Sequence, residues 1–346
     1  MTNPGRVGYI DTWRCIAVFG VIISHLNRQE GLQTTAVAGE IGVFLFFFIS
    51  GFVVSKTCLI ESRTSRRFSS SAFYVRRLFR IAPPLLIYIS ICLALGWVGA
   101  IDFGATQALS AAAYICNVDL VDCGWYGGHT WSLAFEEQFY LLFPLIFAWV
   151  ETSRRPSFFF LVLFSALASL PFLFSLHWIG KTGFAVIYGL FAMGYFFAKH
   201  EHRLHKIGNA SLLFFLGLAL TFLPVGLFGG LWAEKYYKFV YVISIPMMIS
   251  ASGNPFFAAK KLLELRLTRY IGRISYSIYL WQQFFTGYFH DFPMGVRLIV
   301  LVGMVLWCAC LFAYVETPLI RAGSRLSNSL RSRAPMSPPV ADTPTP

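Results

Sequence analysis

Long apolar runs separated by short polar segments dominate the pattern of hydrophobic and polar positions along the 346-residue chain. A helix that crosses a bilayer needs about 17–25 mostly apolar residues. Segments of this kind occur at 10–27, 37–55, 82–100, 133–150, 158–178, 181–198, 210–231, 237–251, 272–290 and 296–315. The pattern therefore predicts an all-α polytopic membrane protein with about ten transmembrane helices.

The segments between and after these runs define the domain organisation. Residues 1–323 are predicted to form one membrane domain, and the Pro- and Ser-rich residues 324–346 a disordered cytoplasmic tail. The longest stretch between spans, 101–130, contains a run of small residues that suits a re-entrant or surface helix. Cys116 and Cys123 share this stretch, so they form either a disulfide in an oxidising compartment or two free thiols.

Composition and charge agree with a membrane location. The chain is 57% hydrophobic and 13% charged, whereas a soluble domain carries about 25% charged residues. Of 28 Lys and Arg, 22 fall in loops on one predicted side, and the positive-inside rule makes that side cytoplasmic. Both termini are then cytoplasmic, in a multi-pass cell-membrane protein, with the bacterial inner membrane as the expected site. The net charge of +12 reflects this topology rather than a nucleic-acid partner.

Charged side chains inside the predicted spans are candidates for function, because burying them in lipid is costly. Arg14 and His25 lie eleven residues apart in the first span, which places them on nearly the same helical face. Asp11 shares that face one turn earlier and is positioned to pair with Arg14. The alternative is that Arg14 snorkels to the inner headgroups and that His25 marks the outer edge of the span.

The fourth span contains a second polar stripe. Ser132, Glu136 and Tyr140 follow one another at i, i+4 and line one face of the helix. Glu137 adds an adjacent carboxylate, and either acid is a candidate base or orienting group for a histidine. The alternative places both carboxylates at the headgroup level, with Trp131 in the aromatic belt.

Other candidates lie at the ends of spans. Arg77 and Arg80 belong to a predicted interfacial helix over 73–83, where they bind either anionic lipid headgroups or a cytosolic phosphate group. His129 is predicted to share the external side with His25. Glu316 ends the last span and is either functional or simply solvated. Because no CxxC occurs among the seven Cys, no metal site is predicted.

Six motifs, taken in order, resemble those of one family, the acyltransferase 3 group of integral membrane sugar O-acyltransferases. The motifs are Arg14-x10-His25, the Gly-Val-Phe to Ser-Gly-Phe stretch at 42–52, Arg77-x-x-Arg80, the Trp-Ser-Leu to Phe-Tyr stretch at 131–140, Gly-Arg-Ile-Ser-Tyr to Leu-Trp at 272–281, and Glu316-x-Pro318. The resemblance covers residues 8–323.

The resemblance implies transfer of an acyl group, commonly acetyl, from cytosolic acyl-CoA to a hydroxyl of a carbohydrate or glycolipid. Acyl-CoA is then a co-substrate, and no bound cofactor is expected. His25 takes the role of base or acyl relay. By the separate logic of a catalytic triad's acid, Glu136, or alternatively Glu137, is expected to hold its tautomer. Residues expected to engage the donor are Arg14, Arg77 and Arg80. Residues expected to have acceptor or structural roles are Asp11, His129, Trp131, Ser132, Tyr140, Tyr276, Tyr279 and Glu316.

One departure and one rival remain open at this point. Many family members have a histidine where this chain has Gln282. The rival function is a secondary transporter or flippase for a polar solute, which would use the same intramembrane charges. Transporters tend to carry paired repeats, and the sequence shows none. The sequence does not determine the acceptor, the acyl chain length or the oligomeric state.

Overall fold

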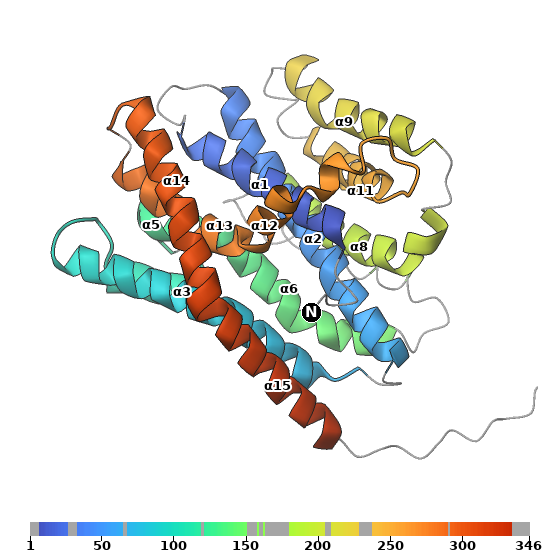
Figure 1. Cartoon of the computed structure of the whole chain (residues 1–346), viewed down its shortest axis with the longest axis horizontal. Coiled ribbons are helices and arrows are strands. Elements are labelled where there is room, and N and C mark those ends of the chain that lie inside the picture. The colour runs from blue at the N-terminus through green and yellow to red at the C-terminus, as the bar shows by residue number, and fades with distance from the viewer. Residues whose placement is uncertain are drawn as a thin grey trace, which may run out of the picture.

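The computed structural model describes residues 7–26, 33–64, 68–118, 121–150, 158, 162, 180–204, 209–227, 237–289 and 291–333. Within these residues the chain is helical and contains no strand (Figure 1). The α-helices are α1 (Gly8–Leu26), α2 (Gln33–Thr64), α3 (Ser70–Trp97), α4 (Ala105–Ala112), α5 (Gly124–Gly128), α6 (Thr130–Val150), α8 (Gly180–Leu204), α9 (Ala210–Leu227), α11 (Tyr241–Ser252), α12 (Arg266–Arg273), α13 (Ser275–Tyr288), α14 (Met294–Leu311) and α15 (Thr317–Arg333). Short 3-10 turns precede α11 and α12, and a π-helical turn, Phe312–Glu316, joins α14 to α15.

Four helical stretches in the described part of the chain are long and apolar enough to cross a membrane. They are Gly8–Leu26, Ala36–Thr64, Ser70–Trp97 and Met294–Arg331, and shorter apolar helices occupy Ala210–Phe222 and Lys238–Gly253. These helices support a membrane protein, whereas the total of about ten spans and the side of each terminus stay predictions. The predicted span 158–178 lies outside the described residues, apart from two isolated positions.

Two boundaries differ from the sequence prediction. The predicted interfacial helix 73–83 and the span 82–100 form one helix, α3, which continues through Pro83 and Pro84. Helix α15 continues to Arg333, so residues 324–333 are helical rather than part of a tail. Helix α15 lies beside α3 (Figure 1). It is also joined to α2 by an ion pair, because Arg331 Nη2 lies 2.5 Å from Glu61 Oε2. Residues 334–346 lie outside the described part.

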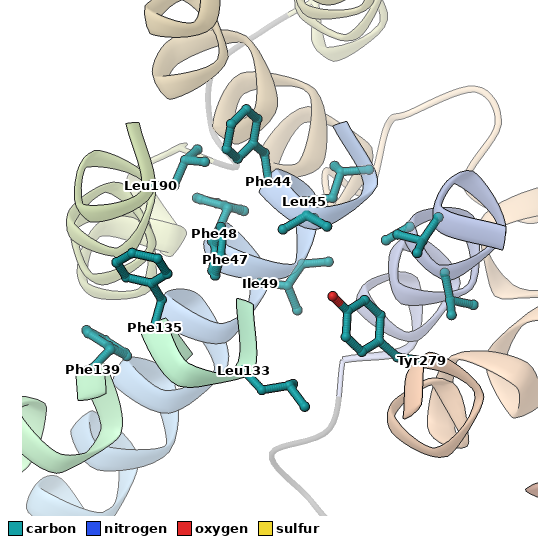
Figure 2. Packing of buried hydrophobic residues seen from close by; sticks show 14 of the residues in the cluster. Phe44, Leu45, Phe47, Phe48, Ile49, Leu133, Phe135, Phe139, Leu190 and Tyr279 are labelled. Atoms are coloured by element: carbon teal, nitrogen blue, oxygen red, sulfur yellow. The ribbon is translucent and has the colours of Figure 1, made fainter. Parts of the chain in front are cut away.

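Helix α2 forms the centre of the core and packs against α1 on one side and α8 on the other. Figure 2 shows its Phe44, Phe47 and Phe48 beside Phe135 of α6 and Leu190 of α8. The α1–α2 approach depends on Gly42, because a Cβ there would lie 2.5 Å from the Ala17 carbonyl oxygen. Small residues allow this close packing in lipid, where the hydrophobic effect does not drive helices together. The packing fixes the position of α1, which carries Arg14 and His25.

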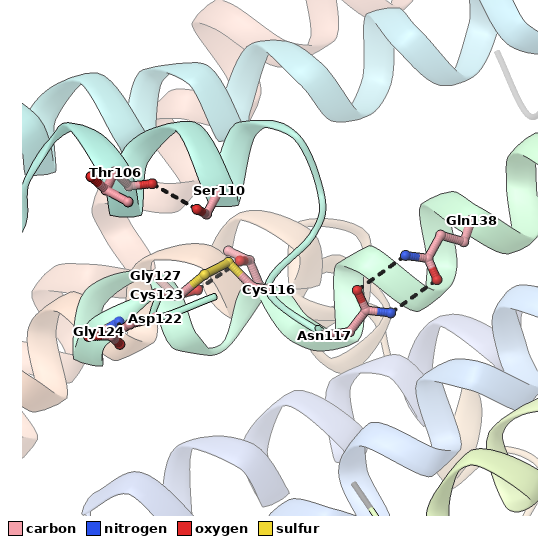
Figure 3. The surroundings of a disulfide bond; sticks show 10 residues. Thr106, Ser110, Cys116, Asn117, Asp122, Cys123, Gly124, Gly127 and Gln138 are labelled. Carbon is pink, nitrogen blue, oxygen red and sulfur yellow. Dashed lines mark hydrogen bonds between the residues drawn. A yellow bond between two sulfur atoms is a disulfide. The ribbon is translucent and has the colours of Figure 1, made fainter. Parts of the chain in front are cut away.

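The loop between α3 and α6 is held by a disulfide between Cys116 and Cys123, one of the two alternatives left open by the sequence (Figure 3). The small-residue run forms helix α4, as expected, and Cys123 directly precedes α5. Asn117 and Gln138 exchange two amide hydrogen bonds, of 3.0 and 3.2 Å, which attach the loop to α6. The loop is therefore an ordered element that carries α5 to a defined place.

Candidate active site

A small cavity lies among α1, α2, α6 and α13. Its volume is about 30 Å³, enough for a water molecule or two. The residues that line it are Arg14, Val43, Phe46, Phe47, Ser132, Leu133, Glu136, Ser275, Tyr276 and Tyr279. Five of the predicted site residues thus meet at one place, although they come from three separate helices.

Glu136 is the centre of the polar cluster beside this cavity. The Tyr140 hydroxyl donates a 2.9 Å hydrogen bond to Glu136 Oε2. The guanidinium of Arg77 lies over the Tyr140 ring, 4.3 Å from its centroid, and both Arg77 and Arg14 interact electrostatically with Glu136. Ser50 hydrogen-bonds to Glu136 and Tyr140 as well. Sequence reasoning gave Ser50 no role, although it lies in the motif at 42–52.

Glu137 and Glu316 extend the acidic groups toward the arginines of α3. Glu137 interacts electrostatically with Arg77 and Glu136. Glu316 is buried at the π-helical turn, accepts a hydrogen bond from Ser277, and interacts electrostatically with Arg80. Arg77 therefore interacts with half-buried carboxylates and Arg80 with a buried one, and Glu316 is not simply solvated.

His129 and Tyr279 form a second hydrogen-bonded group, next to the cavity. The Tyr279 hydroxyl donates to the His129 carbonyl oxygen at 3.0 Å and lies 2.6 Å from Ser132 Oγ. The His129 ring packs against Tyr88 and Tyr279, with centroid distances of 5.5 and 5.7 Å. Burial, and then the nearby His25, lowers the pKa of His129 to about 3. His129 is therefore a neutral imidazole at physiological pH.

His25 lies at the far end of α1 from Arg14, and its ring meets that of Trp125 edge to face. The centroids are 5.8 Å apart and the planes are inclined by 88°. Trp125 is fixed by two hydrogen bonds with Gln283: its Nε1 donates to the Gln283 carbonyl at 3.0 Å, and Gln283 Nε2 donates to its carbonyl at 2.6 Å. Sequence reasoning missed Trp125, which comes four residues before His129 in the loop.

Orientation of His25 by Glu136, or alternatively by Glu137, stays a prediction. The groups that interact with Glu136 include Arg14, Ser50, Arg77 and Tyr140. Eleven residues of helix between Arg14 and His25 correspond to about 16 Å along the axis. Trp125 is a neighbour that the structure places against the His25 imidazole.

The remaining predicted residues pack and connect helices. Trp131 lies against Phe47 and Phe135, with centroids 6.2 Å away in each case. The Tyr276 hydroxyl donates to the Ile81 carbonyl at 2.9 Å and joins α13 to α3. These contacts favour structural roles for both aromatic residues.

Asp11 has an ion-pair contact with Arg273, whose Nε is 3.8 Å from Asp11 Oδ2. The contact lies where α1 crosses α12, so Asp11 connects these two helices.

Comparison with known proteins identifies the family of the chain. The model of the acyltransferase 3 family, described as an acyltransferase domain, matches residues 7–314. The chain is 26% identical to the O-acetyltransferase OatA of Staphylococcus aureus (strain NCTC 8325 / PS 47), over 93% of this chain and 58% of the relative. It is 24% identical to the putative O-acetyltransferase SAR0937 of strain MRSA252, over 94% of this chain and 59% of the relative. No solved structure matches significantly.

The match over most of its length shows that the chain belongs to the acyltransferase 3 family. The chain spans a little under three fifths of the curated relatives that it matches. The matched range spans the predicted site residues Arg14, His25, Arg77, Arg80 and Glu136.

Proposed function

We propose that the protein is a membrane O-acyltransferase that moves an acyl group, acetyl above all, from cytosolic acyl-CoA to a hydroxyl of an exported carbohydrate or glycosylated molecule. The observation that carries the proposal is helix α1, an apolar helix that holds Arg14 at one end of the site and His25 at the other. The family and the names of the relatives support transfer of an acetyl group to oxygen.

The arginines of α3 bind the donor in this proposal. Arg77 and Arg80 are one helical turn apart, and guanidinium groups suit bidentate contact with the phosphates of CoA. By the predicted topology they face the cytosol, where acyl-CoA is made. The long pantetheine arm of CoA suits the separation of about 16 Å between the Arg14 level and His25, and it would bring the thioester toward the imidazole.

His25 carries the chemistry. Its neutral imidazole takes the proton of the acceptor hydroxyl while that oxygen bonds to the thioester carbon. The carbon–sulfur bond then breaks. His25 returns its proton to the sulfur, and CoA leaves as the thiol. Transfer through a brief acyl-imidazole uses the same residue as a nucleophile and the same groups around it. Trp125 fixes the ring plane in either case.

A strain that lacks the gene, complemented with wild type or variants, tests the proposal. Surface glycans are treated with mild base, and the released acetate is measured per amount of expressed protein. Wild type is expected to restore the acetate, whereas His25→Ala is not. The matched control is His202→Ala, on the exposed end of α8. Full acetate release from His25→Ala cells would overturn the assignment of His25. Equal acetate in the complemented and uncomplemented strains would overturn the acyltransferase function.

A further inference from the structure

Gln282 on α13 has an amide group without a partner. The residue is 0% exposed, and neither Oε1 nor Nε2 makes a hydrogen bond within the described part of the chain. Two donors near it on α13 are paired: the Tyr279 hydroxyl with the His129 carbonyl, and Gln283 Nε2 with the Trp125 carbonyl. Burying an amide without hydrogen bonds is strongly unfavourable, so the group points to a partner from outside the chain.

Gln282 lies on α13 between the cavity and the pair formed by His25 and Trp125. Ser275, Tyr279 and Gln282 follow one another at i, i+4 and i+7 and so share one helical face. The first two line the cavity, and Gln282 continues that face by one turn. The next residue along α13 is hydrogen-bonded to Trp125, whose ring contacts His25. Gln282 therefore lies on the turn of α13 between the cavity and the His25–Trp125 pair.

Acyl transfer requires a hydrogen-bond donor beside the carbonyl oxygen of the acyl group. An inference about such a donor rests on the proposed function. When the acceptor oxygen bonds to the thioester carbon, negative charge develops on the carbonyl oxygen until the carbon–sulfur bond breaks. An amide N–H is a neutral donor at every physiological pH. The hydroxyls of Ser132 and Tyr279 are already engaged with each other and with a carbonyl.

We propose that Gln282 is a catalytic residue that donates a hydrogen bond from Nε2 to the acyl carbonyl oxygen in the transition state. A glutamine amide and a histidine imidazole can both offer an N–H at this position. The amide accordingly stabilises the charge that forms on the substrate, while His25 handles the proton.

Inverted membrane vesicles that contain the full-length protein, supplied with labelled acetyl-CoA and their endogenous glycan acceptors, test this role. Gln282→Met keeps the volume of the side chain and removes the donor. Turnover is expected to fall about 100-fold or more, and the apparent KM for acetyl-CoA to change less than about threefold. The midpoint of thermal unfolding is expected to stay the same or rise, because no protein hydrogen bond is lost. Gln282→His keeps an N–H donor and is expected to retain at least about tenfold more turnover than Gln282→Met.

The matched control is Gln138→Met on α6, whose amide is paired with Asn117 and lies outside the cavity lining. It is expected to lower the unfolding midpoint and to leave turnover near wild type. Turnover of Gln282→Met within about threefold of wild type would overturn the role of Gln282. So would equal loss in Gln282→His and Gln282→Met, or a fall in stability that matches the loss of activity. Absence of transfer by wild type would instead overturn the proposed function on which the inference rests.

Discussion

Replacing Gly272 with alanine is expected to push α12 away from α1. A Cβ on Gly272 would lie 1.7 Å from the Asp11 carbonyl oxygen, whereas real Cβ atoms essentially never come within 3.0 Å of such an atom. The obstacle is backbone, so no side chain can rotate out of the way. The two helices must separate by about 1 Å or more, since closely packed interiors leave no room to absorb the clash.

This displacement acts on the site as well as on stability. Overpacking of this kind typically costs about 1–3 kcal/mol of folding free energy. Arg14 lies one turn along α1 from Asp11 and lines the cavity. A misplacement of about 1 Å at such a group can lower the rate about 100-fold. Gly272→Ala is therefore expected to fold with a lower unfolding midpoint and to lose most of its turnover.

Thermal unfolding of the purified protein and labelled acetyl transfer in inverted vesicles measure the two effects. Gly303→Ala on α14 is the matched control, because a Cβ at Gly303 meets nothing within 4 Å. It is expected to behave like wild type in both measurements. If Gly272→Ala kept the wild-type midpoint and turnover, the close crossing of α1 and α12 would be refuted.

Three further predictions concern groups around the site. Tyr140→Phe removes the hydroxyl that donates to Glu136. It is expected to lower turnover about tenfold in the vesicle assay, because hydrogen bonds to charged groups contribute about 1.5–3 kcal/mol; unchanged turnover would show that this bond is dispensable. The double change Cys116→Ser and Cys123→Ser is expected to lower the unfolding midpoint and turnover together, because the disulfide closes the loop that ends in α5. Activity equal to wild type would show that α5 keeps its place without the bond. Trp125→Phe, which retains an aromatic ring, is expected to keep more turnover than Trp125→Ala. Equal loss of turnover in both variants would show that the ring contact with His25 does not contribute to turnover.

The sequence predicted those parts of the molecule that depend on local spacing. The polar stripe of Ser132, Glu136 and Tyr140 follows from the helical repeat, and the structure places it beside the cavity. The apolar runs likewise predicted helices in their described parts. The prediction separated an interfacial helix over 73–83 from a span over 82–100, whereas α3 runs unbroken through Pro83 and Pro84. In a membrane helix, neighbouring groups can satisfy the backbone around proline, and α3 continues.

Contacts between distant segments were not available from spacing. Arg77 lies over the Tyr140 ring because α3 packs near α6, and nothing in either local sequence specifies that contact. The pairing of Trp125 with His25 joins a loop helix to the end of α1. Glu136 interacts electrostatically with Arg14 of α1 and Arg77 of α3, and local spacing specified neither contact, whereas its predicted orientation of His25 stays a prediction.

Transfer of labelled acetyl from acetyl-CoA to vesicle glycans by His25→Ala is the most direct test of the central claim, that this imidazole takes the proton of the accepting hydroxyl. The variant is compared with wild type at equal expression and equal unfolding midpoint. Its turnover is predicted to fall between about 100-fold and about 10⁴-fold, the range that a general base contributes. The apparent KM for acetyl-CoA is predicted to stay near wild type, because the change leaves the proposed donor-binding residues Arg77 and Arg80 intact. Wild-type turnover in His25→Ala would show that the imidazole of His25 does not take this proton.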